Sequence, residues 1–273
     1  MPGRRAITWW IGCIVALLLT GSVVVAFTLR HHTASTAFTG PVPDQSRPGP
    51  VLLVPGYGGK KAALDTLAKT IEVATGRTAI VINLLGDGTG DLVAEARLLD
   101  GDIAAQIRAG APSVDLIGYS AGGVVVKLLF SGFAAARDVR RVITIGSPFH
   151  GTAIATLAAI FVSPDCPAAC KQLAPVNSMI KNLSAAPLPR GLPWLSIWST
   201  GDTTIRPADS SRLTGAVNVP AQAICPHESI SHSSLPTDPL VDGLVLGALG
   251  TGPIRMPVAS ECGLLRERGH ATP

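Results

Sequence analysis

Residues 114–123 read VDLIGYSAGG, an apolar run that breaks at Gly-x-Ser-x-Gly and leads into the apolar residues 124–130. A buried strand, a sharp turn and a following helix form the setting in which a serine hydroxyl is presented as a nucleophile. Gly118 and Gly122 suit such a turn, because a Cβ at either position would collide with the neighbouring strand and helix. We therefore predict that Ser120 is a catalytic nucleophile; the alternative is a strand-to-helix turn that only needs small residues.

Strand-like and helix-like segments alternate along the chain on both sides of this turn. Alternation of this kind implies right-handed crossovers and a mostly parallel central sheet with helices on both faces. The predicted fold class is therefore α/β. The expected strands cover residues 51–54, 78–84, 114–117, 141–148, 194–199 and 218–224, and the expected helices cover 62–75, 92–109, 124–130 and 240–249.

A glycine-rich turn, PGYGG at residues 55–59, follows the first expected strand. Its glycines let the backbone approach a substrate carbonyl closely, so the N–H of Tyr57 is one predicted donor to an oxyanion. The other is the N–H of Ala121, because it lies at the N-terminus of the helix after Ser120, where the helix dipole favours negative charge. An ordinary strand-exit turn is the alternative for residues 55–59.

The acid of a catalytic triad is expected after the strand at 194–199. The turn that follows it, TGDTTIRP, places Asp202 at the carboxyl edge of the sheet, where the catalytic groups of parallel sheets collect. Asp202 is therefore the predicted acid. Asp209, Asp238 and Asp242 are interpreted as turn or cap residues.

The predicted base is His232, in the loop between the last expected strand and the expected helix at 240–249. A base that follows the acid along the chain agrees with the order Ser, Asp, His. His227, beside Cys225 and Pro226, is the alternative base. His150 precedes Asp202 and is interpreted as structural.

The N-terminus differs in composition from the rest of the chain. Residues 6–29 carry no charge and follow Arg4 and Arg5, which is typical of a segment that spans a bilayer or directs export. We expect residues 1–32 to be a signal anchor or a cleaved signal peptide, residues 33–50 a Pro/Ser/Thr-rich tether, and residues 51–273 one catalytic domain that lies outside the membrane. Without the three arginines of the first 40 residues, the chain holds 19 basic and 18 acidic residues, so nucleic acid is not an expected partner.

Four cysteines follow the apolar segment and allow three pairings. We prefer Cys166 with Cys170, which are close neighbours, and Cys225 with Cys262, which would enclose the loop that carries His232. The cysteine and histidine spacings match no zinc pattern, and the loop at 86–91 lacks the EF-hand spacing, so no metal is expected. The segment 152–193 interrupts the alternation and is interpreted as a possible cap over the site, or as a structural insertion.

These residues resemble those of the secreted bacterial triacylglycerol lipases and esterases of the α/β-hydrolase superfamily. The resemblance covers residues 51–249 and rests on five motifs in the family's order, namely VPGYGG at 54–59, VDLIGYSAGG at 114–123, TIGSPFHGT at 144–152, GDTTIRP at 201–207 and SHS at 231–233. Many relatives carry histidine where this chain has Pro55 and Tyr119. Neither position supplies a triad atom, so the departures bear on substrate preference.

The resemblance implies a serine ester hydrolase in which Ser120 is the nucleophile, Asp202 the acid, His232 the base, and Tyr57 and Ala121 the oxyanion donors. It implies a lipid or acyl-ester substrate and no cofactor. Two alternatives stay open, an acyltransferase of the cell envelope that uses the same triad, and a non-catalytic binding protein on a hydrolase scaffold. The sequence does not indicate an oligomeric state.

Overall fold

The computed structural model describes residues 40–156 and 166–270. The predicted signal anchor or signal peptide at 1–32 lies outside these residues, as does the first part of the expected tether. Among the residues described, none of the helices combines the length and the apolar character that crossing a bilayer requires.

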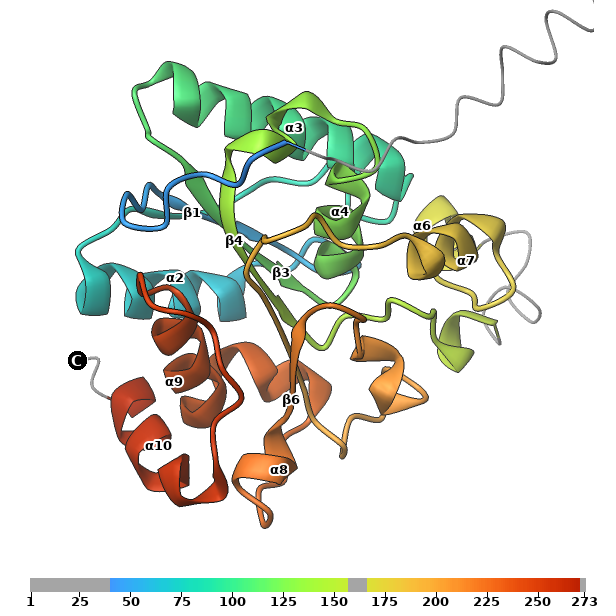
Figure 1. Ribbon diagram of the computed structural model, residues 1–273. Helices are drawn as coiled ribbons and strands as arrows, with labels where there is room; N and C mark the ends of the chain where they lie inside the picture. Colours follow the sequence, from blue (N-terminus) through green and yellow to red (C-terminus); the bar gives the residue numbers. More distant parts are fainter. Residues whose placement is uncertain (1–39, 157–165, 271–273) are drawn as a thin grey trace, which may run out of the picture. The chain divides into compact units, whose positions relative to one another are not determined.

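A six-stranded, fully parallel sheet forms the centre of the molecule (Figure 1). Its strand order is β2-β1-β3-β4-β5-β6, so the strand that leads into Ser120 is central. The predicted α/β class is confirmed. The strands are β1 Val51–Val54, β2 Ala79–Val81, β3 Val114–Tyr119, β4 Val139–Ile145, β5 Trp194–Trp198 and β6 Val217–Pro220.

Two strands, β2 and β6, are much shorter than the sequence suggested. β2 ends at Val81, opposite Leu53 of β1, and not at residue 84, and the last bond between the two strands runs from the N–H of Ile82 to the carbonyl of Leu53. β6 ends at Pro220, opposite the last residue of β5, Trp198. The apolar residues 221–224, expected to continue this strand, form the short helix α8.

Helices cover both faces of the sheet, as predicted. α3 and α4 pack on the face that includes Leu52 and Leu116, and α2, α9 and α10 pack on the face that includes Leu53 and Ile117, an arrangement visible in Figure 1. Adjacent strand residues thus enter opposite cores, which explains their continuous apolar runs. The α-helices are α2 Ala62–Thr75, α3 Leu92–Arg108, α4 Ala121–Leu129, α6 Ala168–Gln172, α7 Ser178–Ala185, α8 Ala221–Ile224, α9 Pro239–Ala248 and α10 Cys262–His270, and the 3-10 helices are η1 Ala134–Asp138, η2 Ala208–Ser211, η3 His232–Thr237 and η4 Ala259–Glu261.

The segment between β4 and β5 carries α6 and α7, and groups of the main domain hold both helices. The N–H of Ala169 donates to the carbonyl of Thr89, and the buried Lys127 of α4 donates to the carbonyl of Leu183 at the end of α7. Burial lowers the pKa of Lys127 to about 8. Residues 157–165 lie outside the described part of the chain, so a cap over the site stays a prediction.

The C-terminal helix α10, which we did not predict, packs closely against α9. A Cβ on Gly243 would lie 1.9 Å from the carbonyl oxygen of Leu265, and one on Gly269 would lie 1.9 Å from that of Pro239. Only glycine therefore permits this approach of the two helix backbones.

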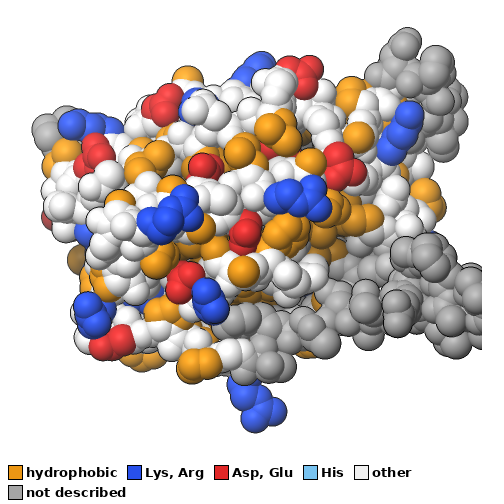
Figure 2. Space-filling model, turned by 90° about the horizontal axis from the view of Figure 1, so that it is seen from above, with side chains coloured by type: hydrophobic (Ala, Val, Ile, Leu, Met, Phe, Trp, Pro, Cys, Tyr) orange, Lys and Arg blue, Asp and Glu red, His pale blue; other side chains and the backbone are white. Residues whose placement is uncertain are grey.

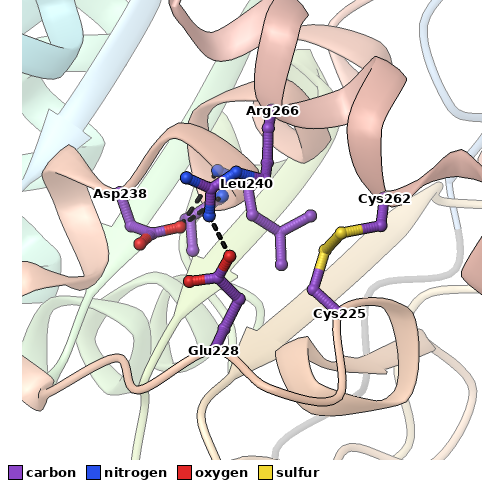
Figure 3. The surroundings of a disulfide bond; sticks show 7 residues. Cys225, Glu228, Asp238, Leu240, Cys262 and Arg266 are labelled. Carbon is purple, nitrogen blue, oxygen red and sulfur yellow. Dashed lines mark hydrogen bonds and ion pairs between the residues drawn. A yellow bond between two sulfur atoms is a disulfide. The ribbon is translucent and has the colours of Figure 1, made fainter.

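Both predicted cysteine pairs are confirmed as disulfides, Cys166–Cys170 and Cys225–Cys262. The second joins the loop before His232 to the first residue of α10 (Figure 3). Beside it, Arg266 of α10 forms an ion pair with Glu228 of the same loop. The loop is thus attached to α10 by one covalent and one ionic link.

The face seen in Figure 2 carries both charges without segregation. On the face seen in Figure 2, basic and acidic side chains alternate and hydrophobic side chains lie between them. This face therefore offers no continuous basic surface of the kind that binds nucleic acid.

Candidate active site

Ser120 lies at the turn between β3 and α4 in a strained backbone conformation. Its φ of 54° and ψ of −126° make it the single non-glycine residue with positive φ in the part of the chain that the structure describes. The turn is held by a 2.8 Å hydrogen bond from the Ser120 N–H to the carbonyl of Ile145 in β4. Such strain persists only where the surrounding structure enforces it, which is typical of a nucleophile elbow.

The two glycines of the motif are required by close contacts. A Cβ on Gly118 would lie 2.5 Å from the Cα of Gly123, and a Cβ on Gly122 would lie 2.2 Å from the carbonyl oxygen of Val54. The start of α4 therefore lies directly against β3 and β1. Only glycine fits at these two positions, as the sequence predicted.

The structure brings Ser120, His232 and Asp202 together from three distant parts of the chain. The Oγ of Ser120 lies 3.0 Å from Nε2 of His232, and Nδ1 of His232 lies 2.6 Å from Oδ2 of Asp202. In the tautomer that this geometry requires, Nδ1–H donates to Asp202, and Nε2 accepts the hydroxyl proton of Ser120. The three side chains form a continuous hydrogen-bonded chain that ends at the hydroxyl.

Asp202 is fixed by the backbone that follows it. Its Oδ1 accepts hydrogen bonds from the N–H groups of Thr204 at 2.8 Å and Ile205 at 2.9 Å, which leaves Oδ2 for the imidazole. The residue is only 4% exposed. Its charge is therefore held in one orientation by donors that do not compete for the same oxygen.

The other candidate acids lie away from Ser120, and one differs from our interpretation. Asp238 caps α9 through the N–H groups of Leu240 and Val241, as expected for a cap residue. Asp242 is not a cap or turn residue, because it lies inside α9, is only 5% exposed, and has an Oδ1 atom without a hydrogen-bond partner. Burial, and secondarily the charge of Asp238, raises the pKa of Asp242 to about 8.

The other two candidate histidines are not part of this chain of hydrogen bonds. His227 is an exposed residue. His150 contacts Ser184 of α7 through Nδ1, at 2.5 Å, and the carbonyl of Arg212 through Nε2, at 3.1 Å. It therefore links α7 to the segment after η2, in agreement with a structural role.

The two predicted oxyanion donors belong to segments that adjoin Ser120. The turn that carries Tyr57 touches the elbow, since a Cβ on Gly56 would lie 2.9 Å from the Cβ of Ser120. Ala121 begins α4. Within the described residues, the N–H groups of Tyr57 and Ala121 have no hydrogen-bond acceptor and can donate to a bound group.

The sequence did not indicate two residues that contact the imidazole of His232. The ring of Tyr119 stacks on it with 5.2 Å between centroids, and Gly146, with a φ of 58°, lies so close that a Cβ there would be 3.3 Å from Nδ1. Burial, and secondarily the charge of Asp202, raises the pKa of Tyr119 to about 12. Tyr119 belongs to the predicted turn and Gly146 to the strand expected at 141–148, but only the folded arrangement shows that they meet His232.

No group of three or more His, Cys, Asp or Glu side chains that could hold a metal ion occurs among the described residues. In the loop at 86–91, the carboxylate of Asp87 accepts hydrogen bonds from the N–H and the hydroxyl of Thr89. These bonds lower the pKa of Asp87 and close a local turn.

Comparison with solved structures finds the same fold in two lipases. Aspergillus fumigatus lipase B aligns with a TM-score of 0.63 and 20% identity over 83% of this chain and 58% of its own. Bacillus licheniformis lipase BlEst2 in its mature form aligns with a TM-score of 0.52 and 21% identity over 66% of this chain and 86% of its own. The chain has the α/β-hydrolase fold. At these identities the likeness concerns the fold, and this chain aligns with less than two thirds of the fungal enzyme.

No protein-family model matches the sequence, and no curated protein matches it. The assignment of the α/β-hydrolase fold therefore rests on three-dimensional structure. In that fold the triad partners follow in the order Ser, Asp or Glu, His. Ser120, Asp202 and His232 occur in this order.

Proposed function

We propose that this protein is an exported serine carboxylic-ester hydrolase that acts on lipid or acyl esters through Ser120, His232 and Asp202. The observation that carries the proposal is the unbroken hydrogen-bonded chain from Asp202 through His232 to Ser120. It ends at a hydroxyl on a strained turn of an α/β-hydrolase fold, which is where the nucleophile of such enzymes lies.

The geometry suggests a two-step reaction. Nε2 of His232 accepts the Ser120 proton while Oγ bonds to the ester carbonyl carbon, and the imidazolium then donates that proton to the departing alcohol. Water next attacks the acyl-enzyme, gives its proton to His232 and releases the carboxylic acid as Oγ regains a proton. Asp202 orients the imidazole and stabilises its charged form throughout.

The negative oxygen that develops in both steps would be held by the N–H groups of Tyr57 and Ala121. Both groups are unpaired within the described residues, and both belong to segments that adjoin Ser120. Removal of one such donor typically costs about 10²- to 10³-fold in kcat. Both donors are backbone groups, so this oxyanion site tolerates side-chain variation at residue 57.

Apolar side chains near the carboxyl edge of the sheet support an apolar acyl substrate. Tyr57 and Leu85 lie on loops that follow β1 and β2, Ile154 lies on a helical segment that follows β4, and each is exposed by more than 40%. Exposed apolar groups gathered at one edge are typical of a surface that meets lipid. The lipases among the structural neighbours agree with this substrate class.

Export is supported by the two disulfides, because such bonds persist in oxidising compartments. The uncharged segment at 6–29 would either anchor the enzyme or be removed after export. Mass determination of the protein recovered from the membrane and soluble fractions of the expressing cell distinguishes the two outcomes.

The proposal is tested by hydrolysis of a p-nitrophenyl ester series with the full chain in detergent micelles. Ser120→Ala should lower turnover on the order of 10⁴-fold or more. Ser184→Ala is the matched control, because it removes the serine of the other Ser–His contact, that with His150, and should retain activity. Equal negligible rates in wild type and Ser120→Ala would contradict ester hydrolysis.

A competing alcohol in the same assay separates hydrolysis from acyl transfer. With glycerol or a sugar alcohol present, a hydrolase should still release mainly the free acid. A product that is mainly the new ester would assign the enzyme to acyl transfer. A serine-directed fluorophosphonate that fails to label Ser120 would favour a binding protein.

A further inference from the structure

Tyr119, the residue directly before Ser120, makes two separate contacts with His232. Its ring stacks on the imidazole with 5.2 Å between centroids and 29° between planes. Its hydroxyl donates a 3.0 Å hydrogen bond to the backbone carbonyl of His232. One side chain therefore contacts both the ring and the backbone of the predicted base.

The hydrogen bond from the Tyr119 hydroxyl gives the carbonyl of His232 a partner that no N–H group of η3 provides. The carbonyl of residue 232 would accept from the N–H of Leu235 in a 3-10 helix or from that of residue 236 in an α-helix, but residue 236 is Pro236, which has no N–H. The N–H of Leu235 is already bonded to the carbonyl of Ser231. The Tyr119 hydroxyl fills this position and connects the start of η3 to the end of β3.

The ring contact bears on the charge that His232 acquires during the reaction. An aromatic face beside a cation stabilises the cation, because the ring face carries partial negative charge. A neutral imidazole gains little from the same contact, so stacking favours the imidazolium that forms as Ser120 attacks. The Tyr119 hydroxyl stays protonated under ordinary conditions, because burial and the Asp202 charge raise its pKa to about 12.

We propose that Tyr119 is a positioning residue for His232, which fixes the backbone of the base through its hydroxyl and stabilises the imidazolium through its ring. The inference rests on the proposed function, in which His232 is the base. It assigns a role to the residue directly before Ser120, which is tyrosine in this chain and histidine in many of the proteins that the sequence resembles. Tyr119 acts through His232 and forms no bond with substrate.

Substitution of Tyr119 leaves the charged groups around His232 in place. Asp202 is the charged group bonded to the imidazole in the described structure. On α2 and α9, the helices that pack on η3, Asp65, Lys69 and Asp242 line a groove with Thr237, at the other end of η3, and His270 of α10 lines the same groove. A change in the pKa of His232 on substitution of Tyr119 would therefore report the loss of the tyrosine contacts themselves.

Two variants separate the hydroxyl from the ring. Tyr119→Phe keeps the stacking and removes the hydrogen bond, so kcat should fall about 2- to 10-fold with an unchanged KM and an unchanged pKa of His232. Tyr119→Leu removes both contacts, so kcat should fall further and the pKa of His232 should drop by up to about one pH unit. Phe130→Leu is the control, because Phe130 packs on Trp194 at the end of α4 and not on His232.

The pKa of His232 is measured by NMR titration of the full chain in detergent, which requires no catalysis. The acid limb of the kcat/KM pH profile on a p-nitrophenyl ester gives the same quantity during turnover. A lower pKa in Tyr119→Leu alone, with kcat reduced in both Tyr119 variants, supports the proposal. Wild-type kcat and His232 pKa in both variants, or a change confined to KM, would overturn it.

If the proposed ester hydrolysis is wrong, the experiments give a result that differs from failure of the Tyr119 proposal. In that case wild-type protein hydrolyses no ester and Ser120 is not labelled by a fluorophosphonate, while the NMR titration still shows whether the Tyr119 ring favours the imidazolium. Loss of stability in Tyr119→Leu is measured separately by thermal unfolding. If Phe130→Leu loses as much stability but keeps its kcat, destabilisation is not the cause of the Tyr119 effect.

Discussion

Asp242 shows how burial of a single residue makes the stability of the fold depend on pH. Because its pKa of about 8 lies above the unfolded value, the folded state retains a proton that the unfolded state has lost between about pH 4 and pH 8. Wild type should therefore lose stability as pH rises through this range, by at most about 1.4 kcal/mol per pH unit. Asp242→Asn should abolish this loss and be the more stable protein at pH 8, as measured by urea unfolding at several pH values.

Asp44→Asn is the matched control at this scale. Asp44 is exposed, and hydrogen bonds from Ser46 lower its pKa. The stability difference between wild type and Asp44→Asn should therefore be small, and it should change with pH in the opposite direction, in the acid range. A difference between wild type and Asp242→Asn that stays constant from pH 4 to pH 8 would contradict the assignment of a raised pKa.

At the scale of elements, α10 stabilises the loop that carries His232. The disulfide Cys225–Cys262 closes a sequence separation of 37 residues and, with the Arg266–Glu228 pair, joins this loop to α10. Replacing both cysteines by serine should lower the free energy of unfolding by about 2 to 4 kcal/mol, because the unfolded chain regains the freedom of the open loop. Thermal and urea unfolding measure this loss.

The second disulfide provides the comparison for this prediction. Cys166–Cys170 closes a separation of only 4 residues, so its removal should cost less stability and leave the His232 loop in place. Equal losses in the two double variants would show that constraint of the longer loop is not the source of the effect.

At the scale of the whole molecule, a buried ion cluster joins distant segments at the amino edge of the sheet. Asp115 of β3 pairs with Arg77 and Arg140, whose guanidinium groups also donate to the carbonyls of Gly49 and Leu249. Asp115→Asn would leave the positive charges buried without their counter-ion and should lower the free energy of unfolding by about 3 to 5 kcal/mol. Urea unfolding at neutral pH measures this loss.

An exposed pair is the control for the cluster. Glu261→Gln breaks the ion pair with Arg255, whose side chain is 65% exposed, and should change stability little because water screens it. A similar small effect of Asp115→Asn would contradict a role for the cluster in joining these segments.

The last residues of the expected tether belong to this region, since a Cβ on Gly49 would lie 1.8 Å from the carbonyl oxygen of Ser113.

Most of the architecture follows from local sequence signals. The alternation of apolar strands and helices predicted the parallel sheet, and the glycines of VDLIGYSAGG predicted the turn at Ser120. The positions of Asp202 and His232 after successive strands selected the two side chains that lie next to Ser120, although their catalytic roles remain predictions. These features are readable because each depends on residues close together in the chain, or on the rule that parallel strands end at one edge.

The tertiary structure alone decided the features that depend on which distant segments meet. β6 ends where its neighbour β5 ends, Asp242 is buried where α9 packs against α10, and Tyr119 meets His232 because β3 and η3 are brought together. The cluster around Asp115 likewise joins residues from five parts of the chain. No local pattern encodes such contacts, because burial and pairing depend on what lies opposite a residue after folding.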